Sequence, residues 1–409
     1  MINRLLKLYI DSFRGLPRDI WILSFIMLVN RAGTMVILFL TVYLTQELDF
    51  SFEEAGLTMS FFGVGSVAGT YLGGQLTDRF GYHKVQITAL FLTGILFLVL
   101  LQMTTFWAFS ITIFILTLVS DTFRPACLAA IAAYSTDENR TRSFSLIRMA
   151  INLGFSAGPA VGGAIAIWKG YGTLFWIDGM TCMAAAVLYL LLLKEKQDEH
   201  KQELVPDEQV VEAPSPYRDT YFLLFSVMVM IAALAFMQLF SSYPVYLRQE
   251  MGYTEDTIGM LLSLNGFLIV LVEMPLIYVL ERRDGQFFWI SMGAILFGLS
   301  FFVLNISTLS IMVPMLMIVL ITFGEIFLMP LTNAVAASRS VPQNRGQYMA
   351  LYGISYSIAH IFAPAFGMAI AAQFGFATLW VLCLVLGCVS AIGFWRLRRQ
   401  LEHSAHLSS

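Results

Sequence analysis

Twelve apolar runs of about twenty residues divide this sequence, and they constrain its fold more than any other feature. A run of that length crosses a bilayer as an α-helix, because a helix satisfies its backbone hydrogen bonds internally. Only 12% of the residues are charged, against roughly 25% in soluble proteins, so the chain cannot cover a water-facing surface. We therefore predict an all-α membrane protein with twelve transmembrane helices, at 20–46, 53–77, 84–103, 105–133, 142–168, 173–193, 220–247, 254–280, 286–304, 308–336, 346–372 and 376–395.

The positive charges indicate how these helices are oriented. Of the 24 Lys and Arg residues, 19 fall in the termini and loops on one side, and only Lys169 and Arg248 fall in the loops on the other. Because basic residues are enriched on the cytoplasmic side, we expect both termini to be cytoplasmic. The long polar segment 194–219 then lies on that side too, as a linker between two six-helix bundles, 1–193 and 220–409.

The two predicted bundles are similar in sequence. The hexapeptide VYLTQE at Val42–Glu47 recurs as VYLRQE at Val245–Glu250, and Asn139 recurs as Asn344 at nearly the same offset, each followed by arginine. This is a parallel internal repeat. Transporters built from such repeats bind their substrate near the bilayer midplane at the repeat interface, and they work by rocking one half against the other.

The loop after the second predicted span carries the motif GQLTDRFGYHK, at Gly74–Lys84. Asp78 and Arg79 are expected to cap a helix end there, and Gly81 permits the tight return. The segment resembles the Gly-x-Leu-x-Asp-Arg-x-Gly-Arg-Lys loop of the major facilitator superfamily, although a Tyr-His pair replaces the basic pair. The resemblance implies the twelve-helix major facilitator fold. It also implies that Gly74, Asp78, Arg79 and Gly81 form a latch that holds the two halves in one state.

The fifth predicted span contains a dense run of glycines. The members of this run are Gly154, Gly158, Pro159, Gly162 and Gly163. The glycines share one helical stripe, so a neighbouring helix can approach the backbone closely, and the proline kinks or stiffens the helix. The run resembles the fifth-span motif of the drug/proton antiporters of the same superfamily, which implies antiport. Ordinary tight packing is the alternative. The repeat counterpart keeps the proline and one glycine but lacks the other three, which favours a specialised contact.

Charged side chains lie deep in the first half. Arg31 is roughly 16 Å into its span at about 1.5 Å per residue, and Asp121 and Arg124 are three residues apart on the fourth span, where they can pair. A charge at such depth is costly unless it is paired or wetted, so all three are candidate substrate- or proton-binding residues. A structural ion pair is the alternative for Asp121 and Arg124. We expect Asp178 to be an interface residue near the outer surface.

The deep carboxylates belong to the second half, as Glu273 and Glu325, and His360 lies on the eleventh span. A carboxylate in a low dielectric holds its proton more tightly, which suits a group that loads and releases a proton near neutral pH. Glu273 could instead be a structural brace. A cavity between the halves would be polarised, and a zwitterion could place its carboxylate toward Arg31 or Arg124 and its amine toward Glu325.

A second resemblance concerns the first span. The segment Asn30–Met35, followed by Tyr43-Leu44, resembles the first-span signature of proton-coupled peptide transporters, but the two glutamates of that signature are absent. We therefore predict a secondary active transporter working by alternating access, as a proton-coupled exporter of small organic compounds or drugs. The alternative is a proton-coupled importer of peptides or amino-acid-like zwitterions.

The sequence also limits the partners. There is no Gly-rich phosphate loop, so ATP is not the energy source, and the four cysteines lack the spacing of metal ligands. We expect no enzymatic activity, cofactor, metal or nucleic acid. The expected partners are a small-molecule substrate, protons and the lipid bilayer. We expect a multi-pass monomer in the bacterial cytoplasmic membrane.

Overall fold

A computed structural model describes residues 7, 9–195, 215–281, 283, 285–306 and 310–407. The chain divides into two compact units, which we name by the part of the sequence that dominates each. The amino-terminal unit comprises Gly15–Pro216 and Ala337–Ile354, and the carboxy-terminal unit comprises Met1–Arg14, Tyr217–Ala336 and Ser355–Ser409. Most of the predicted linker 194–219 lies outside the described residues, so the bundle boundaries 1–193 and 220–409 stay predictions.

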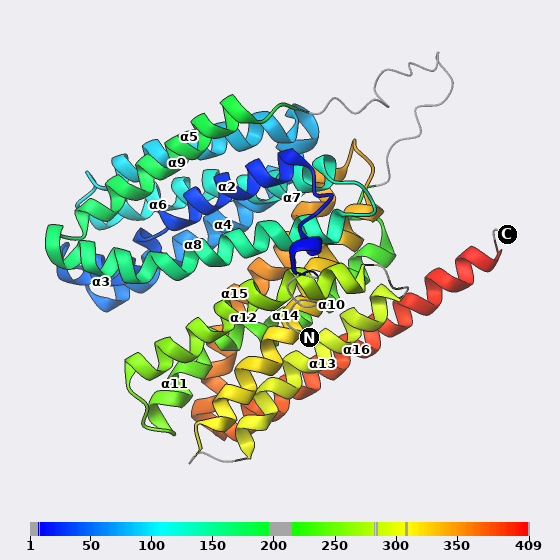
Figure 1. The fold of residues 1–409 in the computed structure, drawn as a ribbon. Coiled ribbons are helices and arrows are strands. Elements are labelled where there is room, and N and C mark those ends of the chain that lie inside the picture. The colour runs from blue at the N-terminus through cyan, green and yellow to red at the C-terminus, as the bar shows by residue number, and fades with distance from the viewer. Residues whose placement is uncertain are drawn as a thin grey trace. The chain divides into compact units, whose positions relative to one another are not determined.

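The first six predicted spans are helical (Figure 1). Their helices are α2 (Arg18–Ala32), α3 (Val36–Gln46), α4 (Phe52–Phe80), α5 (Tyr82–Leu100), α6 (Phe106–Ser120), α7 (Phe123–Tyr134), α8 (Arg140–Lys169) and α9 (Gly172–Leu192). Within the amino-terminal unit, α2 lies beside α8 and α5 beside α9.

The last six predicted spans are helical as well. They contain α10 (Thr220–Phe236), the 3₁₀ helix η2 (Met237–Leu239), α11 (Ser242–Gln249), α12 (Glu255–Leu280), α13 (Gln286–Phe302), η3 (Val303–Asn305), α14 (Met312–Arg339), α15 (Arg345–Phe374) and α16 (Phe376–Leu407). In the carboxy-terminal unit, α13 lies beside α16.

Local capping explains where individual helices begin and end. At the start of α4, Ser51 Oγ accepts from Glu54 N at 3.2 Å while Glu54 Oε2 accepts from Ser51 N at 2.9 Å, which is a reciprocal capping box. Asp219 Oδ1 accepts from Phe222 N at 3.1 Å and begins α10. Gly81, at φ +86°, ends α4 in a conformation that side chains other than glycine rarely adopt.

The predicted repeat is visible in matching local structure. Asn139 Oδ1 accepts from Thr136 N at 2.9 Å, and Asn344 Oδ1 accepts from Val341 N at 3.0 Å. The helices that follow these two turns, α8 and α15, are each 30 residues long. The two halves of the sequence therefore use the same side chain to close the turn that precedes corresponding helices.

Three predicted spans are interrupted within the described residues. In the first span, α2 ends at Ala32 and the helix resumes as α3 at Val36. The fourth span is broken at Asp121 and Thr122. The seventh passes through the 3₁₀ turn of η2 before α11. The continuous helices expected for these spans are therefore wrong in detail, because the backbone leaves the α conformation at points that the apolar runs do not mark.

Nine helical segments among the described residues are long and apolar enough to cross a membrane, and those residues contain no β-strand. The helical class is confirmed. The two helices of the first span, α2 and α3, are only 15 and 11 residues long, and α4 and α8 are long but rich in glycine and polar residues. The count of twelve spans and the cytoplasmic termini stay predictions.

Aromatic side chains fill the core of each unit. In the amino-terminal unit, Tyr43 packs on Phe175 with ring centroids 4.8 Å apart. In the carboxy-terminal unit, Trp380 stacks on Phe301 at 5.3 Å. These rings are almost fully buried, so each unit has its own packed interior in which polar side chains stand out.

Candidate functional site

The break in the first span places Arg31 in the last turn of α2, directly before the backbone leaves the helix. The groups close enough to interact with it electrostatically include Asp121, Arg124 and the thiols of Cys127 and Cys182. Asp121 lies in the break of the fourth span, and Arg124 follows in the first turn of α7. The three predicted residues of the first half are therefore brought together in the amino-terminal unit, with an excess of positive charge.

Asp178 lies on α9 and holds the other side of the same break. Its side chain is only 1% exposed. Both carboxylate oxygens accept from Met35 N at 3.0 Å, and Oδ2 also accepts from Val36 N at 2.8 Å. The expectation that Asp178 is an interface residue near the outer surface is wrong, because its carboxylate satisfies the first N–H groups of α3 in the protein interior.

The glycine run of α8 packs against the first span. A Cβ added at Gly154 would lie 2.8 Å from Arg31 Cβ, and one added at Gly162 would lie 3.2 Å from Met35 Cβ. At Gly163 it would make only an ordinary contact of 3.6 Å with Phe39. The neighbour served by the run is therefore the first span, on both sides of its break.

Two further members of the run, Gly158 and Pro159, lie within the helical part of α8. Their side-chain surroundings lie outside the described residues. The predicted stripe is thus described at Gly154, Gly162 and Gly163, where the spacing does bring another helix close.

A polar cluster in the carboxy-terminal unit surrounds Glu325, whose side chain on α14 is 4% exposed. Asn265 Nδ2, from α12, donates to Glu325 Oε1 at 2.6 Å and to Thr322 Oγ1 at 3.0 Å. Thr322 Oγ1 in turn donates to Ile318 O at 2.7 Å. Both amide protons of Asn265 therefore have acceptors, and one of these acceptors is the carboxylate of Glu325.

The other two candidates of the second half have different surroundings. Glu273 lies on α12 two residues before Pro275 and is fully buried. His360 lies on α15 with an exposed side chain. Asn265 shares α12 with Glu273, but the deep carboxylate that it binds is Glu325.

The motif at the end of α4 contacts a distant helix. Asp78 Oδ1 accepts from Gly346 N at 2.6 Å and Oδ2 accepts from Gln347 N at 2.9 Å. These are N–H groups of the first turn of α15, which have no partner within their own helix. Asp78 therefore does cap a helix end, and that end is the start of α15, while Arg79 lies in the last turn of α4.

The packing around Asp78 is close. A Cβ at Gly74 would lie 3.0 Å from Gly346 O, so only glycine allows α15 to approach α4 there. Asp78 lies beyond the predicted span 53–77. Burial raises its pKa to about 6, and the two backbone donors and the charge of Arg345 offset only part of that rise.

Tyr82 and His83 stand where a basic pair was expected; Tyr82 packs on the end of α7 and His83 on the end of α9. The ring of Tyr82 lies edge-on to Tyr134 at 5.6 Å, and the ring of His83 lies 5.1 Å from that of Tyr189. His83 Nε2 lies 2.9 Å from the carbonyl oxygen of Leu193. This loop therefore fixes the point at which the chain leaves α9.

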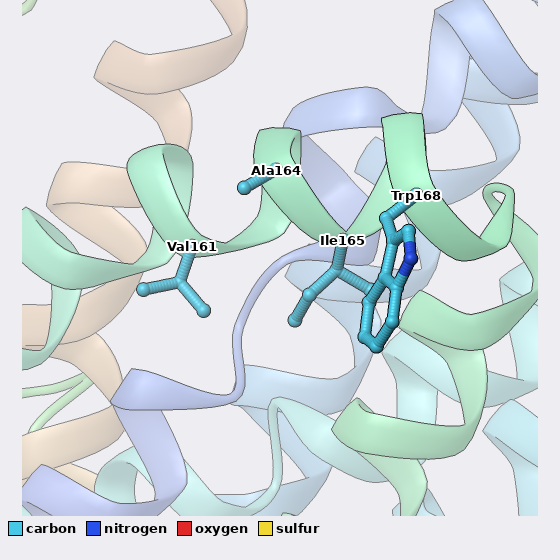
Figure 2. A pocket seen from close by; sticks show the side chains of 4 residues that line it. All are labelled: Val161, Ala164, Ile165 and Trp168. Carbon is cyan, nitrogen blue, oxygen red and sulfur yellow. The ribbon is translucent and has the colours of Figure 1, made fainter.

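An open hollow of about 540 Å³ lies on α8. It is lined by Val161, Ala164, Ile165 and Trp168, and Figure 2 shows these side chains on successive turns of the helix. The lining offers no charged group. None of the predicted charged residues lines it.

Among the described residues, no group of three or more His, Cys, Asp or Glu side chains could hold a metal ion. Sequence reasoning missed two polar residues of the site, Asn265 and Thr322. It also missed the role of Asp178 as a helix cap. An amide inside an otherwise apolar run was a signal for Asn265. Thr322 and the capping role of Asp178 had none, because they depend on which helices pack together.

Comparison with known proteins gives a match to one family profile over most of the chain. The profile described as Major Facilitator Superfamily matches residues 20–340 and, in a second match, residues 225–408. The chain is 25% identical over 389 residues to a Na(+), Li(+), K(+)/H(+) antiporter from Planococcus maritimus, covering 87% of this chain and 89% of that protein. It is 23% identical over 332 residues to Multidrug resistance protein 2 from Bacillus subtilis strain 168, covering 78% of this chain and 80% of that protein.

The fold has close counterparts among solved structures. The human organic anion transporter MFSD10 superposes with a TM-score of 0.77 over 92% of this chain and 99% of its own, at 15% sequence identity. At that identity the likeness concerns the fold alone.

Proposed function

The chain belongs to the Major Facilitator Superfamily, and we propose that it is a proton-coupled antiporter that exports small organic compounds by alternating access. Members of this family are multi-pass membrane transporters rather than enzymes, and they carry small molecules, typically as single chains. Twelve spans, cytoplasmic termini, a location in the bacterial cytoplasmic membrane and function as a monomer are parts of the same proposal.

The observation that carries the proposal is the buried Glu325–Asn265 pair. A carboxylate in a low dielectric is costly to ionise, so it can hold a proton when the surroundings are dry and release it when water enters. The amide of Asn265 supports the ionised form by donating to Oε1 at 2.6 Å. Curated relatives that are named as a cation/proton antiporter and as a multidrug resistance protein support the same class.

The group formed by Arg31, Asp121 and Arg124 is our candidate for substrate contact. Its excess positive charge suits a substrate that carries a carboxylate or another anionic group. Glu273 and His360 are proposed as further proton- or substrate-binding residues, on their depth and position alone. The glycines of α8, together with Pro159, are proposed as the element that lets the first span move as access alternates.

The contact of Asp78 with α15 is our candidate latch. It joins residues from the two sequence halves through two hydrogen bonds, which backbone N–H groups of α15 donate to one carboxyl group. Releasing it frees the first turn of α15. Gly74, Arg79 and Gly81 support the latch by allowing close approach, by favouring the end of α4 and by turning the chain.

Substitution of Glu325 tests the proposal. In proteoliposomes supplied with a probe, either radiolabelled tetraphenylphosphonium or fluorescent carboxyfluorescein, a proton gradient should drive accumulation of the probe by the wild type. Glu325→Gln, which keeps the shape but cannot ionise, should abolish gradient-driven accumulation and spare probe exchange. Asn265→Ala should slow the driven reaction, because the carboxylate loses its donor. Unchanged accumulation by Glu325→Gln would show that Glu325 does not carry the proton.

The import of peptides or zwitterions remains the second candidate, and the positive group around Arg31 favours it. A labelled dipeptide taken up with protons would establish it and would contradict export. Movement of Na⁺, Li⁺ or K⁺ without either organic probe would instead point to cation/proton antiport.

A further inference from the structure

One face of α9 holds the interruption of the first span. Asp178 binds the first N–H groups of α3, and one turn later Cys182 Sγ accepts from Asn30 Nδ2 at 3.4 Å. Between them, Thr181 lies so close to Gly33 that a Cβ at that glycine would overlap its side chain. Residues at these spacings share a helical face, so a single surface of α9 contacts both ends of the break.

The carboxylate has a clear physical task at this break. When a helix restarts, its first N–H groups have no partner in the helix, and in a bilayer water does not replace them. Val36 N donates to Asp178 Oδ2 at 2.8 Å. The negative charge also lies at the positive end of the α3 dipole, so Asp178 stabilises the restart of the helix at one defined residue.

The corresponding break in the carboxy-terminal unit is held in another way. There Gln238 Oε1 accepts from Ser242 Oγ at 2.6 Å, and Gln238 Nε2 donates to Ala363 O at 2.9 Å. Both contacts are neutral. At the offset that pairs Asn139 with Asn344, the partner of Asp178 is Cys383, a buried thiol. Among the described residues, a carboxylate caps the break beside the Arg31 group, whereas the contacts given for this second break are neutral.

We infer that Asp178 is a positioning residue for Arg31. Arg31 lies in the last turn of α2, four residues before the first amide that Asp178 binds. On its other side, Gly154 of α8 comes so close that an added Cβ would lie 3.0 Å from Ala32 N. The end of α2 is thus enclosed between α8 and the capped break, so that loosening the cap lets Arg31 shift. This inference rests on the proposed role of Arg31 in substrate contact.

Two substitutions at one position separate the cap from the charge. Asp178→Asn keeps one oxygen at the place where Oδ2 accepts from both Met35 N and Val36 N, and asparagine caps helices about as well as aspartate. Asp178→Ala removes the cap. Amide hydrogen exchange of the 33–38 segment in the purified full chain shows whether the cap is intact. The KM for the probe transported by the wild type shows whether the substrate site around Arg31 is altered.

We expect Asp178→Ala to raise both the exchange rate and the KM about tenfold, and Asp178→Asn to keep both within about threefold of the wild type. In an Arg31→Lys background, Asp178→Ala should add less than about twofold to the KM, since a residue that acts through Arg31 is not additive with it. Should Asp178→Ala fail to fold, Asp178→Ser, whose side chain is shorter, takes its place.

Three results would overturn the inference. One is unchanged exchange in the capless variant. Another is faster exchange with an unchanged KM, which would mark a purely structural cap. The last is loss of driven transport in Asp178→Asn despite normal exchange, which would assign the role to the charge. If the wild type moves no probe, the proposed function fails. The exchange measurement does not depend on transport, so equal exchange in Asp178→Ala and the wild type would still refute the cap.

Discussion

The three best-defined buried or half-buried carboxylates differ in the donors that hold them, and this difference separates their roles. Asp178 binds backbone N–H groups of a helix in its own unit, which cannot rotate away. Glu325 binds a side-chain amide, which can turn when its surroundings change. Asp78 binds the free N–H groups at the start of α15. These differences fit a structural role for Asp178 and the roles that we propose for the other two, proton transfer for Glu325 and conformational control for Asp78.

Acidification should strengthen the contact between Asp78 and α15. Burial raises the pKa of Asp78 to about 6 from an ordinary 3.8, so the closed contact binds a proton more tightly than the open, solvated carboxyl. The stabilisation is complete below the open-state pKa and is lost as the pH rises through the closed-state pKa. Protection of the Gly346 and Gln347 amides, corrected for intrinsic exchange, should therefore increase between pH 7 and pH 5.

The matched control for this pH effect is Asp78→Asn. Asparagine keeps one acceptor oxygen but does not titrate, so its amide protection should be the same at both pH values. Equal pH dependence in this variant and the wild type would assign the effect to another group. Greater protection of the wild type at pH 7 than at pH 5 would reverse the predicted sign.

At the scale of helices, the close contact between α8 and the first span is the feature most sensitive to volume. Helix α8 lies beside α2 (Figure 1), and glycines of α8 face both α2 and α3. Glycine lets two helices pack closely, but it loses more backbone conformational entropy on folding than other residues do. Any added side chain at the closest point must therefore separate the helices.

Gly154→Ala should destabilise the protein by about 1–3 kcal/mol, the usual range for overpacking, and should impair transport. Its Cβ would lie 2.8 Å from Arg31 Cβ. Gly163→Ala is the matched control on the same helix, since its Cβ meets only Phe39 at 3.6 Å, and it should be neutral or stabilising by up to about 1 kcal/mol. Thermal unfolding in detergent measures both, and equal effects of the two substitutions would contradict the contact.

The sequence predicts where these helices are better than where they break. Apolar length locates every predicted span in a helix, because the bilayer requirement acts on each segment by itself. The interruption after Ala32 has no such local cause. It depends on Asp178, 143 residues away from Met35, and the amide that holds Glu325 is 60 residues from it. The depth of a charged residue can be predicted from one span alone. Its partner can be predicted only if the packing of several spans is known.

At the scale of the whole molecule, the sequence repeat and the family agree on the architecture. The latch motif predicts a contact between the halves and a helix end capped by Asp78, but it does not predict which helix is capped. That helix is α15, whose Gly346 is 268 residues away from Asp78. The orientation of the chain in the membrane is still a prediction from the positive charges.

Labelling of single cysteines should establish that orientation. In a background without the four native cysteines, Asp137→Cys and Lys169→Cys place thiols at two exposed positions on opposite predicted sides. A membrane-impermeant maleimide should label position 169 in intact cells and position 137 only in inverted vesicles. Labelling of both positions from the same side would contradict the predicted topology.

Coupled proton flux tests the central claim most directly. Proteoliposomes containing the wild type and an internal pH-sensitive dye, without an imposed membrane potential, receive a gradient of a transported probe. Antiport predicts proton movement opposite to the probe, dependent on its concentration and absent in Glu325→Gln. Protons that move in the same direction as the probe, or a probe flux without protons, would contradict the account.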